Sequence, residues 1–132
     1  MSHDKQIREV KSATLLRFDK VWQQNFKANQ NAIAQNPGVI ALKNKFRNLP
    51  CIVVGAGPSL DKNIRFLNRA QNKAIIISCD AALKPLMAQG IVPDFVVCLD
   101  PQEDISRFLV NVPHKGITLV VPSIVHPHVL KL

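Results

Sequence analysis

The sequence predicts an α/β fold with a parallel sheet of about four strands, preceded by a helical N-terminal segment. Four short apolar runs carry this prediction, and their first residues stand 21 to 23 positions apart. No charged residue interrupts any of them, and each is shorter than a typical helix, which favours strands buried within a sheet. The runs occupy residues 51–54, 74–78, 95–99 and 117–121.

A helix-like pattern separates each pair of runs. Apolar residues recur at helical spacing within 60–70, 81–88 and 103–110, and Gly90 closes the second of these segments. Strands that alternate with helices form right-handed βαβ units, in which the strands are parallel. We therefore expect a Rossmann-like sheet that is buried on both faces.

Residues 1–49 form a predicted helical lead-in, and residues 50–132 form the predicted nucleotide-binding domain. Asn36-Pro37-Gly38 ends the long helix of the lead-in, and 39–46 is compatible with a short second helix. We expect Trp22 and Phe26 to pack against the core. The residues that recur every three or four positions along the long helix are Leu15, Phe18, Trp22, Phe26, Asn29 and Ile33.

Composition and charge narrow the classes of function. The 132 residues suffice for one modest domain with its own core. The formal net charge is +8, and residues 1–49 carry nine Lys and Arg against three acids. These basic residues are spread along the helical pattern and are not clustered with aromatics as a single-strand binding groove would need, so a solvated basic face is favoured over a nucleic-acid interface.

The N-terminus and the cysteines bear on the compartment. The chain starts with polar residues of mixed charge, and no apolar run approaches the roughly 20 residues that cross a bilayer, so we expect a cytoplasmic location without a membrane span. Cys51, Cys79 and Cys98 lie in or beside apolar runs and show no C-x-x-C spacing. Buried, reduced thiols are therefore expected.

The most informative stretch begins where the first apolar run stops. Gly55-Ala56-Gly57-Pro58-Ser59 joins that predicted strand to a helical pattern. Such a turn exposes backbone N–H groups at a helix N-terminus, which suits a phosphate. Pro58 fits the first helical turn, and Ser59 is placed to cap the backbone or to bind a phosphate oxygen. The dinucleotide fingerprint G-x-G-x-x-G requires glycine where Leu60 stands, so a redox cofactor is disfavoured.

Polar residues also follow the other predicted strands, as Cys79-Asp80, Asp100-Pro101-Gln102 and Pro122-Ser123. The carboxyl ends of parallel strands meet at one edge, so we expect these residues to converge with the glycine turn. Asp80 is placed to bind a ribose hydroxyl, and Asp100 to bind a divalent cation or a substrate group. Helix capping is the alternative for both carboxylates. Asp94 precedes the third strand and is expected in a turn at the opposite edge.

One pair of histidines invites a metal interpretation. In an extended segment, His126-Pro127-His128 would place both rings on one face, as two metal ligands require. No third ligand is evident nearby in the sequence, so histidines of the surface or of the packed core are favoured.

Three segments together resemble the MptE-like family in order and spacing. They are residues 50–64, which contain the glycine turn, and residues 77–83 and 90–101, which contain Asp80 and Asp100. That family joins archaeal 6-hydroxymethylpterin diphosphokinases with bacterial motility accessory factors, the Maf-type flagellin glycosyltransferases. Residues 22–29 are similar to the helical lead-in of the bacterial branch.

The resemblance implies a transferase that moves a nonulosonic acid from a CMP-sugar to Ser or Thr of flagellin. The turn is also similar to the nucleotide-binding turn of CMP-sialic acid sialyltransferases. By this analogy, Asp100 would face the reacting centre, and Ala56 stands where sialyltransferases have asparagine, so that side-chain contact is lost. The residues expected at the donor phosphate or cytidine are Gly55, Ala56, Gly57, Pro58 and Ser59, flanked by Cys79 and Asp80.

Two alternatives stay open. The first is a 6-hydroxymethylpterin diphosphokinase that uses ATP, with Mg²⁺ held by Asp100. The second is a nucleotide-binding or assembly module without turnover. The family pattern continues with further strands after the segments matched here, so we expect an incomplete part of a larger domain, and uncovered strand edges would favour self-association.

Overall fold

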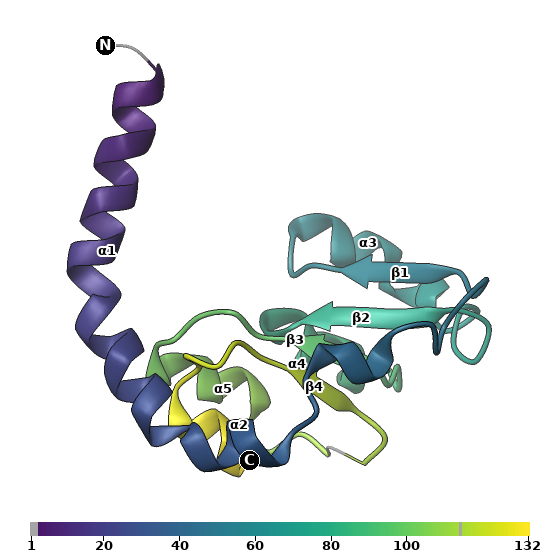
Figure 1. The fold of residues 1–132 in the computed structure, drawn as a ribbon. Coiled ribbons are helices and arrows are strands. Elements are labelled where there is room, and N and C mark those ends of the chain that lie inside the picture. The colour runs from purple at the N-terminus through teal and green to yellow at the C-terminus, as the bar shows by residue number, and fades with distance from the viewer. Residues whose placement is uncertain (1–2, 114) are drawn as a thin grey trace.

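The computed structural model describes residues 3–113 and 115–132. The lead-in comprises α1 (His3–Ala28), α2 (Gln30–Gln35) and the 3₁₀-helix η1 (Val39–Leu42) (Figure 1). Strands and helices then alternate to the C-terminus. In chain order they are β1 (Cys51–Val54), α3 (Pro58–Leu67), β2 (Ile75–Cys79), α4 (Asp80–Ala88), β3 (Phe95–Val97), η2 (Glu103–Ile105), α5 (Ser106–Leu109), β4 (Thr118–Val120) and η3 (Pro127–Lys131).

The four strands form one parallel sheet in the order β1-β2-β3-β4. Asp94, directly before β3, connects β2, β3 and β4 at the amino ends of the strands. Its Oδ2 accepts a hydrogen bond from Ile76 N at 2.8 Å, and its carbonyl accepts one from Thr118 N at 2.9 Å. The predicted α/β class, the parallel sheet and the N-terminal helix are confirmed.

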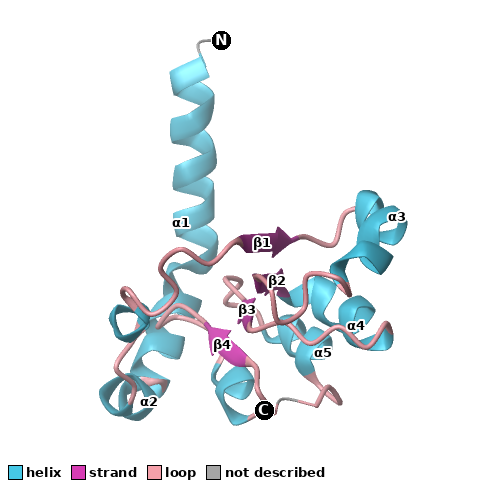
Figure 2. Cartoon of the chain, turned by 90° about the vertical axis from the view of Figure 1, so that its right-hand side faces the viewer, coloured by secondary structure: helices cyan, strands magenta, loops and turns pink. Residues whose placement is uncertain are grey.

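All three crossovers of this sheet step in the same direction, from each strand to the next. Right-handed crossovers that step the same way place their helices on the same face. Accordingly, α3, α4 and α5 lie together on one side of the sheet (Figure 2). Val54, Ile76 and Val96 point toward them and are at most 5% exposed.

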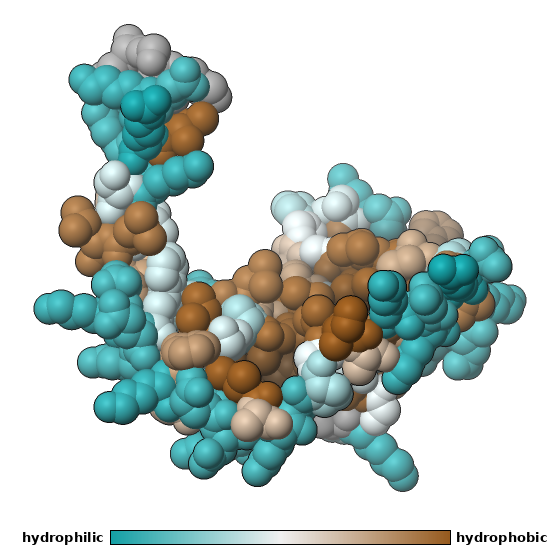
Figure 3. Space-filling model, viewed as in Figure 1, coloured by the Kyte–Doolittle hydropathy of each residue, from teal (hydrophilic) through white to brown (hydrophobic). Residues whose placement is uncertain are grey.

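The opposite face of the sheet is only partly covered, so the predicted burial on both faces is wrong. Val53 on this face is 77% exposed. The segment 42–49 reaches part of it, with the Phe46 ring edge-on to Phe95 at 5.4 Å between centroids. A hollow of about 310 Å³ remains between that segment and the strands. Figure 3 shows apolar residues gathered where the sheet faces α1.

The helix α4 joins two apolar clusters into the core. Leu83 packs into the cluster with Val96 and Leu109, whereas Leu86 packs with Ile76 and residues of β1 and α3. Gly90, with φ +71°, ends the helix in a Schellman motif: Gly90 N donates to Met87 O and Ile91 N to Leu86 O.

The lead-in helix differs from its prediction in three respects. It is divided at Asn29 into α1 and α2, although hydrogen bonds from Asn29 N to Asn25 O and from Ile33 N to Asn29 O continue across the division. Phe26 is 47% exposed, so its predicted core packing is wrong, and Trp22 is half-buried and stacks on Phe18. Only a 3₁₀ turn forms where a second helix was expected.

The first turns of α1 stand away from the rest of the molecule (Figure 1). Most described side chains before Phe18 are exposed. No helix among the described residues combines the length and the apolar character of a membrane span.

The one-sided core predicts unequal effects of two truncations in the sheet. Ile76→Ala should lower the free energy of unfolding by about 2–5 kcal/mol, because it opens a cavity beneath α3 and α4. Val53→Ala removes a similar group from the open face and should cost less than about 1 kcal/mol. Urea denaturation of both variants measures the difference, and equal losses would contradict the one-sided core.

Candidate functional site

The carboxyl ends of β1, β2 and β3 lie side by side at one edge of the sheet. Val54 is paired with Ser78, and Cys79 with Val97, so the chain leaves neighbouring strands at neighbouring points. The residues that leave the sheet there are the predicted ones: the glycine turn after β1, Asp80 after β2 and Asp100 after β3. We call this edge the carboxyl edge.

The glycine turn leads directly into α3. Its residues from Gly55 to Ser59 are all exposed, and Pro58 is the first residue of the helix, as predicted. Gly57 is the N-cap, with an extended backbone (φ −79°, ψ 164°), and no described side chain caps this end of the helix. The first-turn N–H groups and the positive end of the helix dipole are thus presented at the carboxyl edge.

The fold itself does not require glycine at either position of the turn. A Cβ atom built on Gly55 would meet no described atom within 4 Å, and one built on Gly57 would meet only Ser59 Oγ, at 3.9 Å. Neither has the positive φ that makes Gly90 a conformational necessity. Glycine here instead leaves the backbone open to close approach from outside the chain, which is what phosphate binding by a turn needs.

Both predicted carboxylates accept local backbone hydrogen bonds, but neither caps a helix, because Cys79 and Gln102 are the N-caps of α4 and η2 and no described side chain caps either end. Asp80 is the first residue of α4, and its Oδ1 accepts a hydrogen bond from Ala81 N at 2.6 Å. Asp100 Oδ1 accepts one from Gln102 N at 2.9 Å and another from Gln102 Nε2 at 3.2 Å. These bonds hold the two carboxylates at the carboxyl edge, and the helix-capping alternative is not what the structure shows.

Cys98 shows that the two carboxylates belong to one local environment. Its thiol is fully buried, and burial, the Asp80 charge and a hydrogen bond to Asp80 raise its pKa from 9.0 to about 12. The Asp100 charge raises this pKa further, although a backbone hydrogen bond at Asp100 acts in the opposite direction. Asp80 and Asp100 therefore concentrate negative charge around Cys98.

Two carboxylates offer only part of a magnesium shell. Among the described residues, no group of three or more His, Cys, Asp or Glu is placed to hold a metal ion. Mg²⁺ commonly takes one or two carboxylates and completes its shell with water and phosphate oxygens. Asp100 with Asp80 would fit that pattern only together with a bound phosphate.

The end of the fourth strand is placed differently from its prediction. Ser123 lines a separate apolar groove of about 750 Å³ between α2, η1 and β4, with Lys45 as its one described charged lining residue. None of the glycine turn, Asp80 and Asp100 lines this groove. The carbonyl of Ser123 is held by Asn29, a contact that the sequence analysis did not anticipate.

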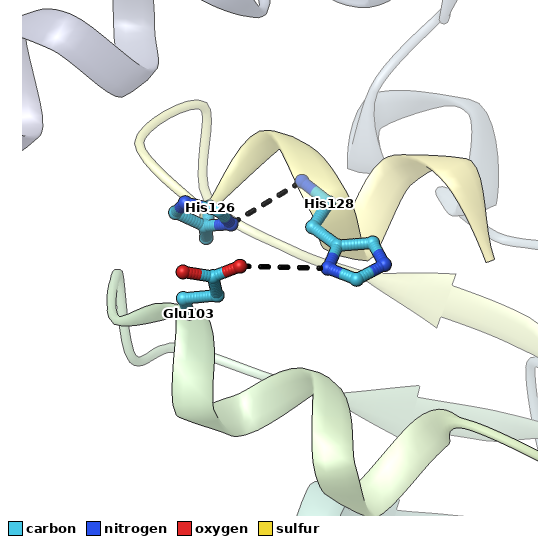
Figure 4. A network of polar contacts seen from close by, with 3 residues as sticks. All are labelled: Glu103, His126 and His128. Carbon is cyan, nitrogen blue, oxygen red and sulfur yellow. Dashed lines mark hydrogen bonds and ion pairs between the residues drawn. The ribbon is translucent and has the colours of Figure 1, made fainter.

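The histidine pair and the neighbouring Glu103 make polar contacts with one another at the surface. Figure 4 shows Glu103 Oε1 beside His128 Nδ1, at 3.8 Å, whereas His126 Nδ1 accepts a hydrogen bond from His128 N at 3.3 Å. The side chains of Glu103 and His128 are 68% and 46% exposed. This arrangement agrees with the interpretation as surface histidines.

Thiol chemistry tests the environment of Cys98. Because the thiolate is the nucleophile, a buried thiol with a pKa near 12 should not react with Ellman's reagent at pH 8, whereas exposed Cys51 should react at once. Cys51→Ser should remove the fast phase, and Cys98→Ser should leave it unchanged.

The same pKa shift has a consequence for stability. The unfolded chain loses the Cys98 proton above pH 9 while the folded chain keeps it, so this contribution to stability is present below pH 9 and declines between pH 9 and 12. Rapid labelling of Cys98 in the folded protein at pH 8 would contradict the buried thiol with a raised pKa, on which both predictions depend.

Comparisons with known proteins agree with this fold. A MAf glycosyltransferase structure from Magnetospirillum magneticum AMB-1 is 34% identical, with a TM-score of 0.56, over 67% of this chain and 15% of that chain. Two uncharacterized proteins of Treponema pallidum (strain Nichols) are 33% identical over 88 residues and 27% identical over 123 residues.

The chain is short beside these relatives. The two alignments include 66% and 92% of this chain but span only 40% and 21% of the two Treponema proteins. The family model described as 6-hydroxymethylpterin diphosphokinase MptE-like matches residues 24–132, which include the whole sheet and the carboxyl edge. The chain belongs to the MptE-like family.

Proposed function

We propose that this chain carries the donor-binding part of a transferase, and that the donor is a CMP-activated nonulosonic acid transferred to Ser or Thr of flagellin. The observation that carries the proposal is the exposed glycine turn at the carboxyl end of β1, where the fold itself does not need glycine. The family and the solved MAf glycosyltransferase support a transferase-type function.

In this proposal the glycine turn binds the phosphate of the donor. The exposed backbone from Gly55 to Ser59 approaches the phosphate oxygens, and Cys79 and Asp80 flank the nucleoside. A CMP-activated nonulosonic acid brings one phosphate charge and one sugar carboxylate to an edge that already holds Asp80 and Asp100. ATP brings several charges and would need Mg²⁺ between them, so the charge of the edge favours the CMP donor.

The proposed reaction is a displacement at the anomeric carbon. The acceptor hydroxyl oxygen forms the new bond to that carbon, and the bond to the phosphate oxygen breaks, with CMP as the leaving group. The amides of the glycine turn stabilise charge that develops on the leaving phosphate. Asp100 faces the reacting centre, positions the acceptor hydroxyl and accepts its proton.

The second candidate is diphosphoryl transfer from ATP to a hydroxymethylpterin. It is favoured by the description of the family and by the paired carboxylates, since Asp80 and Asp100 together could hold Mg²⁺ against a triphosphate.

Isothermal titration with CMP and with ATP, each with and without Mg²⁺, tests the proposal. Gly57→Val should abolish binding while the protein stays folded, because the new side chain blocks approach to the backbone, whereas its Cβ atom would meet only Ser59 Oγ, at 3.9 Å. Ala88→Val, at the far end of α4, adds bulk at an exposed site and should leave the affinity unchanged.

The outcomes separate the candidates. Binding of CMP without Mg²⁺ supports sugar transfer, and binding of ATP only with Mg²⁺ moves the assignment to the diphosphokinase. Unchanged affinity in folded Gly57→Val would overturn the assignment of the glycine turn.

A further inference from the structure

Two asparagines of the lead-in are buried where a helix normally presents apolar residues. Asn25 is 5% exposed and Asn29 is 2% exposed. They are four residues apart, Asn25 in α1 and Asn29 at the division between α1 and α2, and both bind the loops that follow the strands. The C-terminal part of α1 lies beside these loops (Figure 1). Burying an amide is costly unless its polar atoms are hydrogen-bonded, so these contacts must compensate that cost.

The two side chains bind different parts of the structure. Asn25 Nδ2 donates to Pro101 O and to Ile124 O, both at 3.0 Å, and so bridges the loop after β3 and the loop after β4. Asn29 Nδ2 donates to Ser123 O at 3.0 Å and to Val125 O at 2.8 Å, and so holds the second loop only. Both pairs of bonds connect residues more than 75 positions apart.

The bridge made by Asn25 ends beside a candidate site residue. Pro101 follows Asp100 directly, and Gln102 on its other side donates its N–H to Asp100 Oδ1 at 2.9 Å. The carbonyl of Pro101 is therefore fixed by α1 at the centre of the segment that carries the carboxylate. Proline has a fixed φ, so holding its carbonyl leaves this segment little freedom to rotate.

We propose that Asn25 is a positioning residue of the carboxyl edge: it holds the segment 100–102, and with it the Asp100 carboxylate, against the loop that follows β4. The site role of Asp100 rests on the proposed function, whereas the positioning itself does not. Asn29 has similar burial, but its Nδ2 donates both of its hydrogen bonds to the loop after β4, so it is the matched control.

Hydrogen exchange reads the position of Asp100 directly through the amide of Gln102. Asn25→Leu removes both donors at similar side-chain volume and should speed exchange at Gln102 by about tenfold, measured relative to Thr118 at the opposite edge. Asn29→Leu should change this ratio by less than about twofold, because its lost bonds lie in the other loop. Equal ratios in the two variants would overturn the proposal.

A milder variant covers the case in which Asn25→Leu does not fold. Asn25→Ser keeps one hydroxyl donor and leaves room for water, so it should fold and give a smaller increase at Gln102 than the loss of both donors. Exchange at Gln102 identical to that of the wild-type protein would count against the positioning role.

Ligand titration separates this proposal from the proposed function. If the carboxyl edge binds the donor, CMP should shift the Gln102 amide resonance in the wild-type protein and in Asn29→Leu, and Asn25→Leu should lose this shift. If wild-type protein responds to neither CMP nor Mg²⁺ with ATP, the proposed function fails, and the exchange ratios still decide whether Asn25 holds the segment.

Discussion

The structure depends on one topological constraint: three right-handed crossovers that all step in the same direction along the sheet. This constraint puts α3, α4 and α5 on one face and leaves the other to the short segment 42–49. It also means that the order of the described strands never reverses. Doubly wound sheets bind ligands in the crevice at such a reversal, so here the candidate site is the open carboxyl edge beside β1.

At that edge, the residues that begin the helices are also the residues of the candidate site. The glycine turn is both the entry to α3 and the proposed phosphate contact, and Asp80 is both the start of α4 and a neighbour of Cys98. The lead-in takes part as well, because α1 supplies hydrogen-bond donors to carbonyls of both loops that follow β3 and β4. The edge is thus held from the sheet side by strand pairing and from the outside by a helix.

Much of this architecture could be predicted from the sequence, because strand spacing, the glycine turn and the position of Asp94 follow from local patterns. The one-sided sheet could not, since strand order depends on crossover direction, and apolar strands look the same whether one or two faces are covered. The same limit applies to the lead-in: Phe26 and Asn29 both matched the helical period, yet Phe26 is exposed and Asn29 is buried together with Asn25, which lies outside that period. Two asparagines four residues apart in a helical pattern were the one available signal of a buried polar contact. The sequence could not show which carbonyls accept their hydrogen bonds, because these lie in loops more than 75 positions away.

The central claim is that the carboxyl edge, and not the larger apolar groove, receives the nucleotide. Mapping amide resonances during titration with CMP tests it most directly, because the two regions share no residue. The account predicts that the largest shifts occur at Gly55, Gly57 and Ser59, with smaller ones at Asp80. Shifts confined to the groove residues of η1 and β4, with the glycine turn unchanged, would contradict it.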